Sequence, residues 1–272
     1  MQTKICIDSN KSVYLDYIKN YLENNTRKLL VKKSETNGRT CLLVYGSDKT
    51  NAVLLKLIKE AIADVCCTFY KYNFLSSKLN LQAKSSLEKA TFLKALICFD
   101  RDGDIEEINK LLKVTEKDTL QLDAFINFKL KELKNRWLDI IQLTNENIRY
   151  LSCPDTFTEL LKYLINTNKA KHDEVHIVQK EDRVFVCDSK LNSLTEGQTI
   201  SGYVLGEINN YYCNGERKDA LKISDFEGNV IMSLINLSPK KIVIHENALV
   251  SNREYKMIKN LFLDRIYFSK KI

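Results

Sequence analysis

The pattern of apolar and polar residues is clearest near the end of the chain. An apolar run over residues 230–237 stops at Ser238-Pro239. Because proline lacks a backbone N–H and disfavours a helical residue before it, we expect a helix to end near Leu237. The β-branched run Ile242-Val243-Ile244 follows. A run without alternation is typical of a strand covered on both faces, as in a parallel sheet.

A second helix and a closing strand are predicted after this run. Ser251-Asn252-Arg253-Glu254 matches a capping box, in which the Ser and Glu side chains satisfy backbone N–H groups at a helix start. Arg265-Ile266-Tyr267-Phe268 is then expected to form the last strand. With a β-hairpin over 175–187 before it, the end of the chain is predicted to form a hairpin and an α-β-α-β Rossmann-like unit.

The beginning of the chain predicts a different order of elements. Strands are expected at 4–7, 28–33 and 39–45, and helices at 13–22 and 50–70. Asn37-Gly38 joins the second and third strands, and this dipeptide favours a tight hairpin turn because both central residues need a positive φ. The order β-α-β-β-α is most of a ferredoxin-like sandwich, although a fourth strand is not evident.

The middle of the chain is predicted to be helical, with helices over 87–99, 105–114, 119–144 and 156–165. Residues 189–224 show little pattern, apart from a candidate strand at Tyr203-Val204-Leu205. We therefore predict a mixed α+β and α/β fold. Its three parts are an α+β domain at 1–82, a helical region at 83–170 and an α/β domain at 171–272.

The composition is that of an ordinary globular protein. The 272 residues are 44% hydrophobic and 28% charged, with a formal net charge of +7. This basic excess is smaller than that of a dedicated nucleic-acid-binding domain. No run of about 18 apolar residues indicates a membrane span. The first residues lack the apolar core of a signal peptide, so we expect a cytoplasmic protein.

The eight cysteines are scattered and include no C-x-x-C pair. That spacing is the usual sign of a zinc or redox motif, so neither is supported. In a cytosolic chain of this length we expect the cysteines to be reduced and packed.

Two short segments resemble ion-binding loops but lack essential residues. In Gly46-Ser47-Asp48-Lys49-Thr50, Asp48 stands where a phosphate-binding loop needs glycine beside the lysine. The run 100–104 starts like a calcium loop, but Ile105 replaces the glycine of the sharp turn and Leu111 replaces the bidentate Glu. We expect both segments to be helix starts.

His172 and His176 have the four-residue spacing of a helical zinc site. Their surroundings predict a strand instead, in which positions four apart are separated by about 13 Å. The two rings could not then share one ion. We expect no metal and no cofactor.

A polar group near the strand at 241–245 is a candidate site. Open parallel sheets bind ligands beyond the carboxyl ends of their strands, and His and Glu suit acid–base chemistry. The candidate contacts for a ligand or partner are His245, Glu246, Asn247, Lys240 and Lys241. These residue types are equally common in turns and caps.

The predicted helix at 119–144 offers a second candidate surface. Phe128 lies almost opposite its apolar stripe, and the candidate basic patch is Phe128, Lys129, Lys131, Lys134 and Arg136. An aromatic ring among lysines suits base stacking with phosphate contacts alongside. It also suits a packed helix whose lysine stems cover apolar neighbours.

Three segments resemble the YtxC-like family, which is linked by name to sporulation. Residues 120–131 resemble its segment of leucines, Phe-Ile and Phe-basic-Leu-Lys. Residues 174–178 resemble its histidine-containing strand, and 231–245 resemble its closing helix, proline, basic pair, strand and histidine. The resemblance covers roughly 118–269 and fades in the first hundred residues. It implies a cytosolic protein of endospore-forming bacteria.

These observations leave three functions open. The first is a non-enzymatic sporulation factor that binds a protein partner, because no residues form a recognisable catalytic set. The second is nucleic-acid binding through the basic patch. The third is small-ligand binding or enzymatic chemistry at the carboxyl end of the strand at 241–245.

Overall fold

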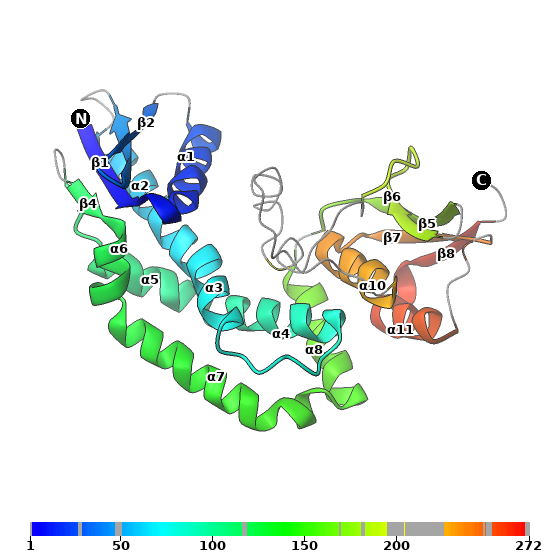
Figure 1. The fold of residues 1–272 in the computed structure, drawn as a ribbon. Coiled ribbons are helices and arrows are strands. Elements are labelled where there is room, and N and C mark those ends of the chain that lie inside the picture. Colours follow the sequence, from blue (N-terminus) through cyan, green and yellow to red (C-terminus); the bar gives the residue numbers. More distant parts are fainter. Residues whose placement is uncertain are drawn as a thin grey trace. The chain divides into compact units, whose positions relative to one another are not determined.

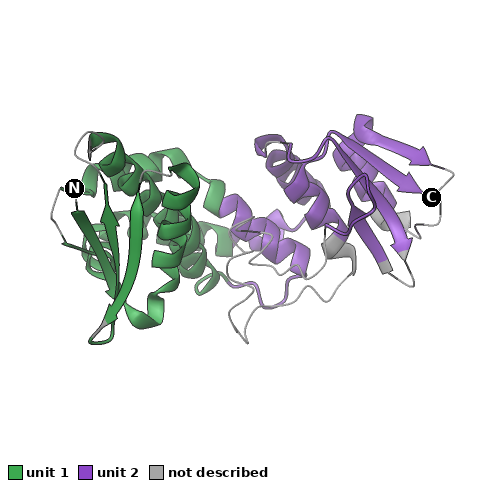
Figure 2. Ribbon diagram, turned by 90° about the horizontal axis from the view of Figure 1, so that it is seen from above, with its two compact units in different colours: residues 1–79, 97–145 green, residues 80–96, 146–272 purple. Residues whose placement is uncertain are grey.

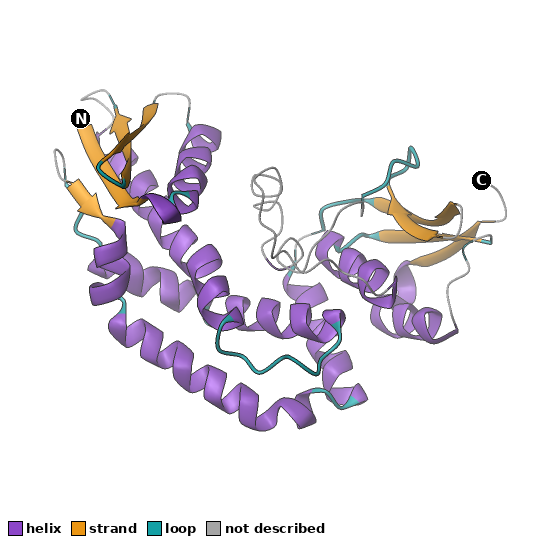
Figure 3. Ribbon diagram, in the orientation of Figure 1, coloured by secondary structure: helices purple, strands orange, loops and turns teal. Residues whose placement is uncertain are grey.

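The structure is a computed structural model that describes residues 2–26, 29–46, 51–115, 119–168, 170–180, 183–194, 204, 226–246, 248 and 252–269. These residues form a mixed α/β fold with two mixed sheets, which confirms the predicted class (Figure 3). Among them, none of the helices combines the length and the apolarity needed to cross a membrane.

The chain folds into two compact units (Figure 2). Unit 1 consists of Met1–Leu79 and Ile97–Asn145, and unit 2 of Asn80–Leu96 and Glu146–Ile272. Helices α4 (Ser86–Cys98) and α7 (Lys131–Leu151) contribute residues to both units. These units are defined by packing, and the three-part division based on sequence patterns stays a prediction.

Unit 1 contains a four-stranded sheet in the order β2-β3-β1-β4 (Figure 1). Its strands are β1 (Gln2–Asp8), β2 (Leu30–Thr36), β3 (Arg39–Tyr45) and β4 (Thr119–Gln121). β3 is antiparallel to both neighbours, and β4 is parallel to β1. At the β2–β3 turn, φ is 52° at Asn37 and 72° at Gly38, which confirms the predicted Asn-Gly hairpin.

The helix predicted at 119–144 is wrong at both ends. Thr119–Gln121 pairs with β1 as β4, so β1 satisfies the backbone groups that a helix would have satisfied internally. The short helix α6 (Leu122–Ala124) and the π-helix η4 (Phe125–Lys129) follow. Leu130 leaves the helical region, with φ −90° and ψ 20°, and α7 then continues to Leu151.

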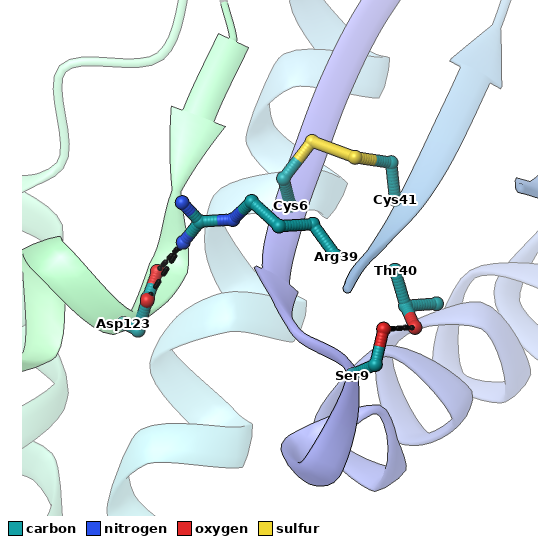
Figure 4. Close-up of a disulfide and its surroundings, with 6 residues drawn as sticks. All are labelled: Cys6, Ser9, Arg39, Thr40, Cys41 and Asp123. Atoms are coloured by element: carbon teal, nitrogen blue, oxygen red, sulfur yellow. Dashed lines mark hydrogen bonds and ion pairs between the residues drawn. A yellow bond between two sulfur atoms is a disulfide. The ribbon is translucent and has the colours of Figure 1, made fainter. Parts of the chain in front are cut away.

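Cys6 and Cys41 form a disulfide between β1 and β3 (Figure 4). They face each other in the antiparallel register, and their Cα atoms are 4.1 Å apart, the close spacing of a non-hydrogen-bonded pair. The prediction of reduced cysteines is therefore wrong for these two, because the non-local pairing of β1 with β3 brings them together. Cys66, Cys67 and Cys187 are not part of this bridge and are buried.

The Arg39 side chain extends from β3 to Asp123 of α6 (Figure 4). Its Nη2 lies 2.8 and 2.7 Å from the two carboxylate oxygens of Asp123. Close by, the Thr40 hydroxyl is 3.0 Å from that of Ser9. The Arg39–Asp123 ion pair holds the start of the α6–η4 segment against the sheet, and the Thr40–Ser9 contact joins β3 to the 3-10 turn η1 (Ser9–Lys11).

The other helices of unit 1 are α1 (Val13–Asn25), α2 (Asn51–Val65), the π-helix η3 (Cys66–Tyr70), α3 (Lys71–Ser76) and α5 (Arg101–Leu111), with the 3-10 turn η1 (Ser9–Lys11). Helix α1 packs on β1, β3 and α2. Helix α5 begins four residues earlier than predicted, so Asp102 and Asp104 lie within its first turn.

Unit 2 contains a second four-stranded sheet, in the order β6-β5-β7-β8. Its elements are α8 (Pro154–Thr167), β5 (Glu174–Lys180), β6 (Arg183–Cys187), α10 (Phe226–Leu237), β7 (Lys241–His245), α11 (Asn252–Phe262), the 3-10 turn η6 (Leu263–Arg265) and β8 (Ile266–Ser269). β5 is antiparallel to β6, and β5, β7 and β8 are parallel. β7 is interior and Ile242–Ile244 are buried, which confirms the predicted covered strand.

Five predicted features lie wholly or partly outside the described residues. They are the loop at 47–50, the turn at 181–182, the strand at 203–205 except the buried Val204, Asn247, and the capping box at 251–254.

Candidate functional site

His245, at the carboxyl end of β7, contacts a second histidine on the neighbouring strand. Its Nε2 lies 2.9 Å from Nδ1 of His176 on β5, and the ring centroids are 5.2 Å apart. Because His176 is opposite Val243 in the parallel register, His245 projects from the same face of the sheet. His245 is 6% exposed, and the His176 side chain is 14% exposed.

The two rings share one proton across this contact. A neutral imidazole has one N–H donor and one acceptor nitrogen, so one ring donates and the other accepts. Such a pair is suited to proton transfer, which is the ordinary chemistry of histidine near neutral pH.

Charged and aromatic side chains surround the pair on this face. Glu174 Oε1 lies 2.9 Å from His176 Nε2, and its Oε2 lies 2.7 Å from Lys241 Nζ. Lys241 Nζ is also 5.1 Å from the ring centroid of Tyr267 on β8. The hydrogen bond from Lys241 lowers the pKa of Glu174 and keeps the carboxylate ionised. We call Glu174, His176, Lys241, His245 and Tyr267 the histidine cluster.

The histidine cluster lies on the face of the sheet opposite α11. Phe268, the strand neighbour of Tyr267, points the other way and contacts Tyr255 of α11 with ring centroids 6.0 Å apart. The cluster therefore combines two largely buried imidazoles with a carboxylate, an ammonium and a phenol that is half exposed.

Lys240 and Glu246, which were also predicted beside His245, lie apart from the histidine cluster. Lys240 Nζ is 2.7 Å from Asp173, and the two side chains are 70% and 87% exposed. The backbone N–H of Glu246 donates to the Ser269 carbonyl at 3.2 Å, and its side chain is exposed. The structure thus joins Lys241 and His245 through Glu174 and His176, and leaves Lys240 and Glu246 outside.

His176 lies within β5, as predicted, and His172 lies before the strand begins. Among the described residues, no group of three or more His, Cys, Asp or Glu side chains is placed to hold a metal ion. The four-residue spacing drew attention to His172 and did not indicate His245, which lies in a separate predicted strand, as the partner of His176.

Phe128 is the most exposed large apolar side chain in the described part of the chain, at 78%. It lies on η4, whose Phe125 and Ile126 are buried. Lys129 and Lys131 are exposed next to it in the sequence. We call Phe128, Lys129 and Lys131 the Phe128 surface.

The remaining two residues of the predicted basic patch are held by contacts within unit 1. Lys134 Nζ donates to the Asn127 carbonyl at 3.2 Å, and partial burial lowers the pKa of Lys134. Arg136 Nη1 lies 2.5 Å from Glu107 Oε2, and its Nη2 lies 3.7 Å from Asp104 Oδ1. Neither cation belongs to the Phe128 surface.

A buried polar network that the sequence did not predict lies next to Arg136. Lys71 Nζ is 2.8 Å from Asp104 Oδ2, and Trp137 Nε1 donates to the same oxygen at 3.0 Å. The side chains of Lys71 and Asp104 are only 2% and 4% exposed. Of the residues in this network, the sequence pattern singled out Asp104 alone, as part of a predicted acidic helix start.

The sequence profile of the YtxC-like family matches residues 55–267. The chain belongs to the YtxC-like family. The match begins well before residue 118, so the family segment includes most of α2 as well as the motifs that carry the resemblance. No curated protein and no solved structure matches the chain.

The part of the chain shared with the YtxC-like family contains the histidine cluster, the Phe128 surface and the Lys71–Asp104–Trp137 network. Strands β1, β2 and β3 and helix α1 precede it. Of the four strands in the sheet of unit 1, the segment that matches the family therefore contributes β4 alone.

Proposed function

We propose that this member of the YtxC-like family is a cytoplasmic, sporulation-associated factor that binds a protein partner and has no catalytic role. The observation that carries the proposal is the exposure of Phe128, 78% of whose surface meets solvent. Burial of apolar surface on association is favourable by about 25 cal/mol per Å². An aromatic ring held outward by a folded helix can therefore anchor a partner. Family membership supports the link to sporulation.

The charges beside Phe128 favour a protein over a nucleic acid. Nucleic-acid affinity depends on several phosphate contacts made by cations. Lys134 and Arg136 are already engaged within unit 1, so only Lys129 and Lys131 accompany the ring. Two lysines beside an apolar anchor suit a protein surface with an apolar pocket and carboxylates at its rim.

Site-specific photo-crosslinking tests this proposal. A photoreactive phenylalanine analogue at position 128, in sporulating cells of an endospore-forming bacterium, should capture one reproducible protein. The matched control carries the analogue at Leu143, which is 59% exposed on α7 of the same unit. Phe128→Ala should abolish co-purification of the captured protein, and Leu143→Ala should not. Absence of a crosslink at 128, or the same products from both positions, would refute the proposal.

Nucleic-acid binding is the second candidate, and the exposed ring beside two lysines is the observation that favours it. This function requires affinity for single-stranded RNA or DNA that falls steeply with salt, since phosphate contacts release counterions. Lys131→Glu and Phe128→Ala should each weaken such binding. Affinity that is insensitive to salt and to both changes would exclude this candidate.

Small-ligand binding or acid–base chemistry at the histidine cluster is the third candidate, favoured by the 2.9 Å contact between the two rings. The sequence contains three histidines, so imidazole resonances are easily assigned. A ligand of the cluster should shift the resonances of His176 and His245 and leave those of His172 unchanged. A ligand that shifts all three equally would not be acting at this site.

A further inference from the structure

A cavity of about 270 Å³ lies beside Trp137 in unit 1. It is bounded by α3, by the residues between α4 and α5, by α5 and by α7. Phe99, Trp137 and Ile140 give it an apolar wall. The volume is just below the roughly 300–1,000 Å³ of sites for drug-sized ligands, so any ligand should be small.

The two cations at this cavity are both neutralised by neighbouring groups. Lys71 Nζ lies 2.8 Å from Asp104 and donates to the Phe99 carbonyl at 3.1 Å. Arg136 Nη1 lies 2.5 Å from Glu107. An anionic ligand would have to compete with a carboxylate that is already in place.

The carboxylates at the cavity are in excess of the cations. Asp100 and Asp139 line it, and neither forms an ion pair with any residue that the structure describes. Asp104 also lines it and is 3% exposed. Its Oδ1 has one contact in the described part of the chain, with Arg136 at 3.7 Å, which is too long for a hydrogen bond. Three carboxylates thus line the cavity, against two cations that are already neutralised.

We propose that this cavity binds a small organic cation, an ammonium group carried on a short apolar body. Asp100, Asp139 and Asp104 Oδ1 supply negative charge in a site partly shielded from water, where attraction to a cation is stronger than in bulk solvent. The apolar body lies against Phe99, Trp137 and Ile140. The exposed ring of Phe99 can in addition face the cation.

Trp137 makes this site directly observable, because it is the single tryptophan of the sequence. Its indole N–H donates to Asp104, so occupancy of the cavity changes the surroundings of the fluorophore. We would titrate the full chain with n-hexylammonium, and with 1-hexanol and hexanoate as neutral and anionic matches. Isothermal titration calorimetry on the same solutions detects binding that leaves fluorescence unchanged. Hexylammonium should bind at millimolar or lower concentration and at least tenfold more tightly than either match.

Asp139→Asn tests the role of charge, since Asp139 is exposed on α7 and the change keeps its shape. It should raise the dissociation constant of hexylammonium about tenfold. Glu132→Gln is the matched control, an exposed acid on the same helix that does not line the cavity. It should leave the constant unchanged, as should Phe128→Ala, which separates this site from the Phe128 surface.

Three results would overturn the proposal. One is equal affinity for hexylammonium and 1-hexanol, which would show an apolar cavity without charge selection. Another is an unchanged constant in Asp139→Asn. The third is a lack of saturable hexylammonium binding by both fluorescence and calorimetry.

Discussion

Lys71 Nζ lies 2.8 Å from Asp104 Oδ2, and both side chains are shielded from water. The pair joins the first residue of α3 to the first turn of α5. Trp137 of α7 donates to the same carboxylate oxygen, and Lys71 also donates to the Phe99 carbonyl. Three helices and the end of α4 therefore meet at one ion pair. Loss of one partner of such a pair leaves the other charge buried and uncompensated.

Lys71→Met should lower the free energy of unfolding by about 3–5 kcal/mol, because Asp104 then loses its counter-ion. Lys110→Met is the matched control. Lys110 pairs with Glu106 at 2.7 Å, but their side chains are 71% and 69% exposed, and such exposed pairs contribute little to stability. Denaturant unfolding followed by Trp137 fluorescence gives both values. Similar losses in the two variants would contradict the structural role of Lys71.

His176→Phe should destabilise unit 2 by about 1–3 kcal/mol, because it removes the ring nitrogen that His245 Nε2 contacts in a largely buried setting. His172→Ala changes a residue outside this contact and should remain within about 0.5 kcal/mol of the parent. Chemical denaturation followed by circular dichroism measures both. Hydrogen exchange of the β7 amides should accelerate in the first variant alone, and an unchanged rate would argue against the histidine contact.

Ser85 and Glu88 form a capping box at the start of α4, and its stability should depend on pH. The Ser85 N–H and hydroxyl each lie 3.0 Å from Glu88 Oε2, and the Glu88 N–H donates to the Ser85 hydroxyl at 3.2 Å. Burial opposes ionisation, but the hydrogen bonds from Ser85 and Ser152 and the charge of Lys84 together lower the pKa of Glu88 below its ordinary 4.5. Ionised Glu88 therefore stabilises the fold above pH 4.5, and this contribution is lost as the pH falls through the lower, folded-state pKa.

Glu88→Ala should accordingly cost about 1 kcal/mol at pH 7, the usual contribution of a helix cap. The difference from the parent should shrink as the pH falls below 4.5 and through the lowered pKa of Glu88. Glu159→Ala, an exposed acid on α8 of the same unit, serves as the control and should have little effect at either pH. Thermal unfolding of the parent, Glu88→Ala and Glu159→Ala at pH values across this range measures how the three stabilities differ. A constant difference between Glu88→Ala and the parent would contradict it.

Peptide mapping without reductant should recover Cys6 and Cys41 in one linked species. The disulfide closes a segment with a sequence separation of 35, for which chain-entropy arguments give a stabilisation of about 4 kcal/mol. A reductant should therefore destabilise the parent protein and leave the double variant Cys6→Ala/Cys41→Ala unchanged. Equal responses of the two proteins would indicate that the bridge contributes nothing.

Elements that depend only on adjacent residues could be predicted from local sequence patterns. Asn37-Gly38 adopts the positive φ angles that its residue types favour, and the β-branched run at 242–244 is an interior strand. Pro154 begins α8, because the missing N–H of proline costs nothing at the first helical position. These features need only the properties of adjacent residues.

The features that the sequence did not predict depend on partners far along the chain. β4 has three residues, and the apolar stripe that starts next to them at Leu122 favours a helix. Pairing with β1 makes these three residues a strand instead. His176 and His245 are separated by 69 positions and meet through the register of two parallel strands. Lys71 ends an apolar helical stripe, and nothing near it in the sequence indicates that Asp104 will neutralise it. Register and long-range pairing are tertiary properties that single-sequence periodicity does not encode.

The two units of this chain are interleaved rather than consecutive. Each is assembled from two stretches of sequence, and α4 and α7 belong partly to both. No single cut in the backbone separates the two units with both intact, and a ribosome must have passed residue 145 before the first unit has all its parts. Recombination at one point in the gene would likewise split at least one unit, so they should be inherited as a single block.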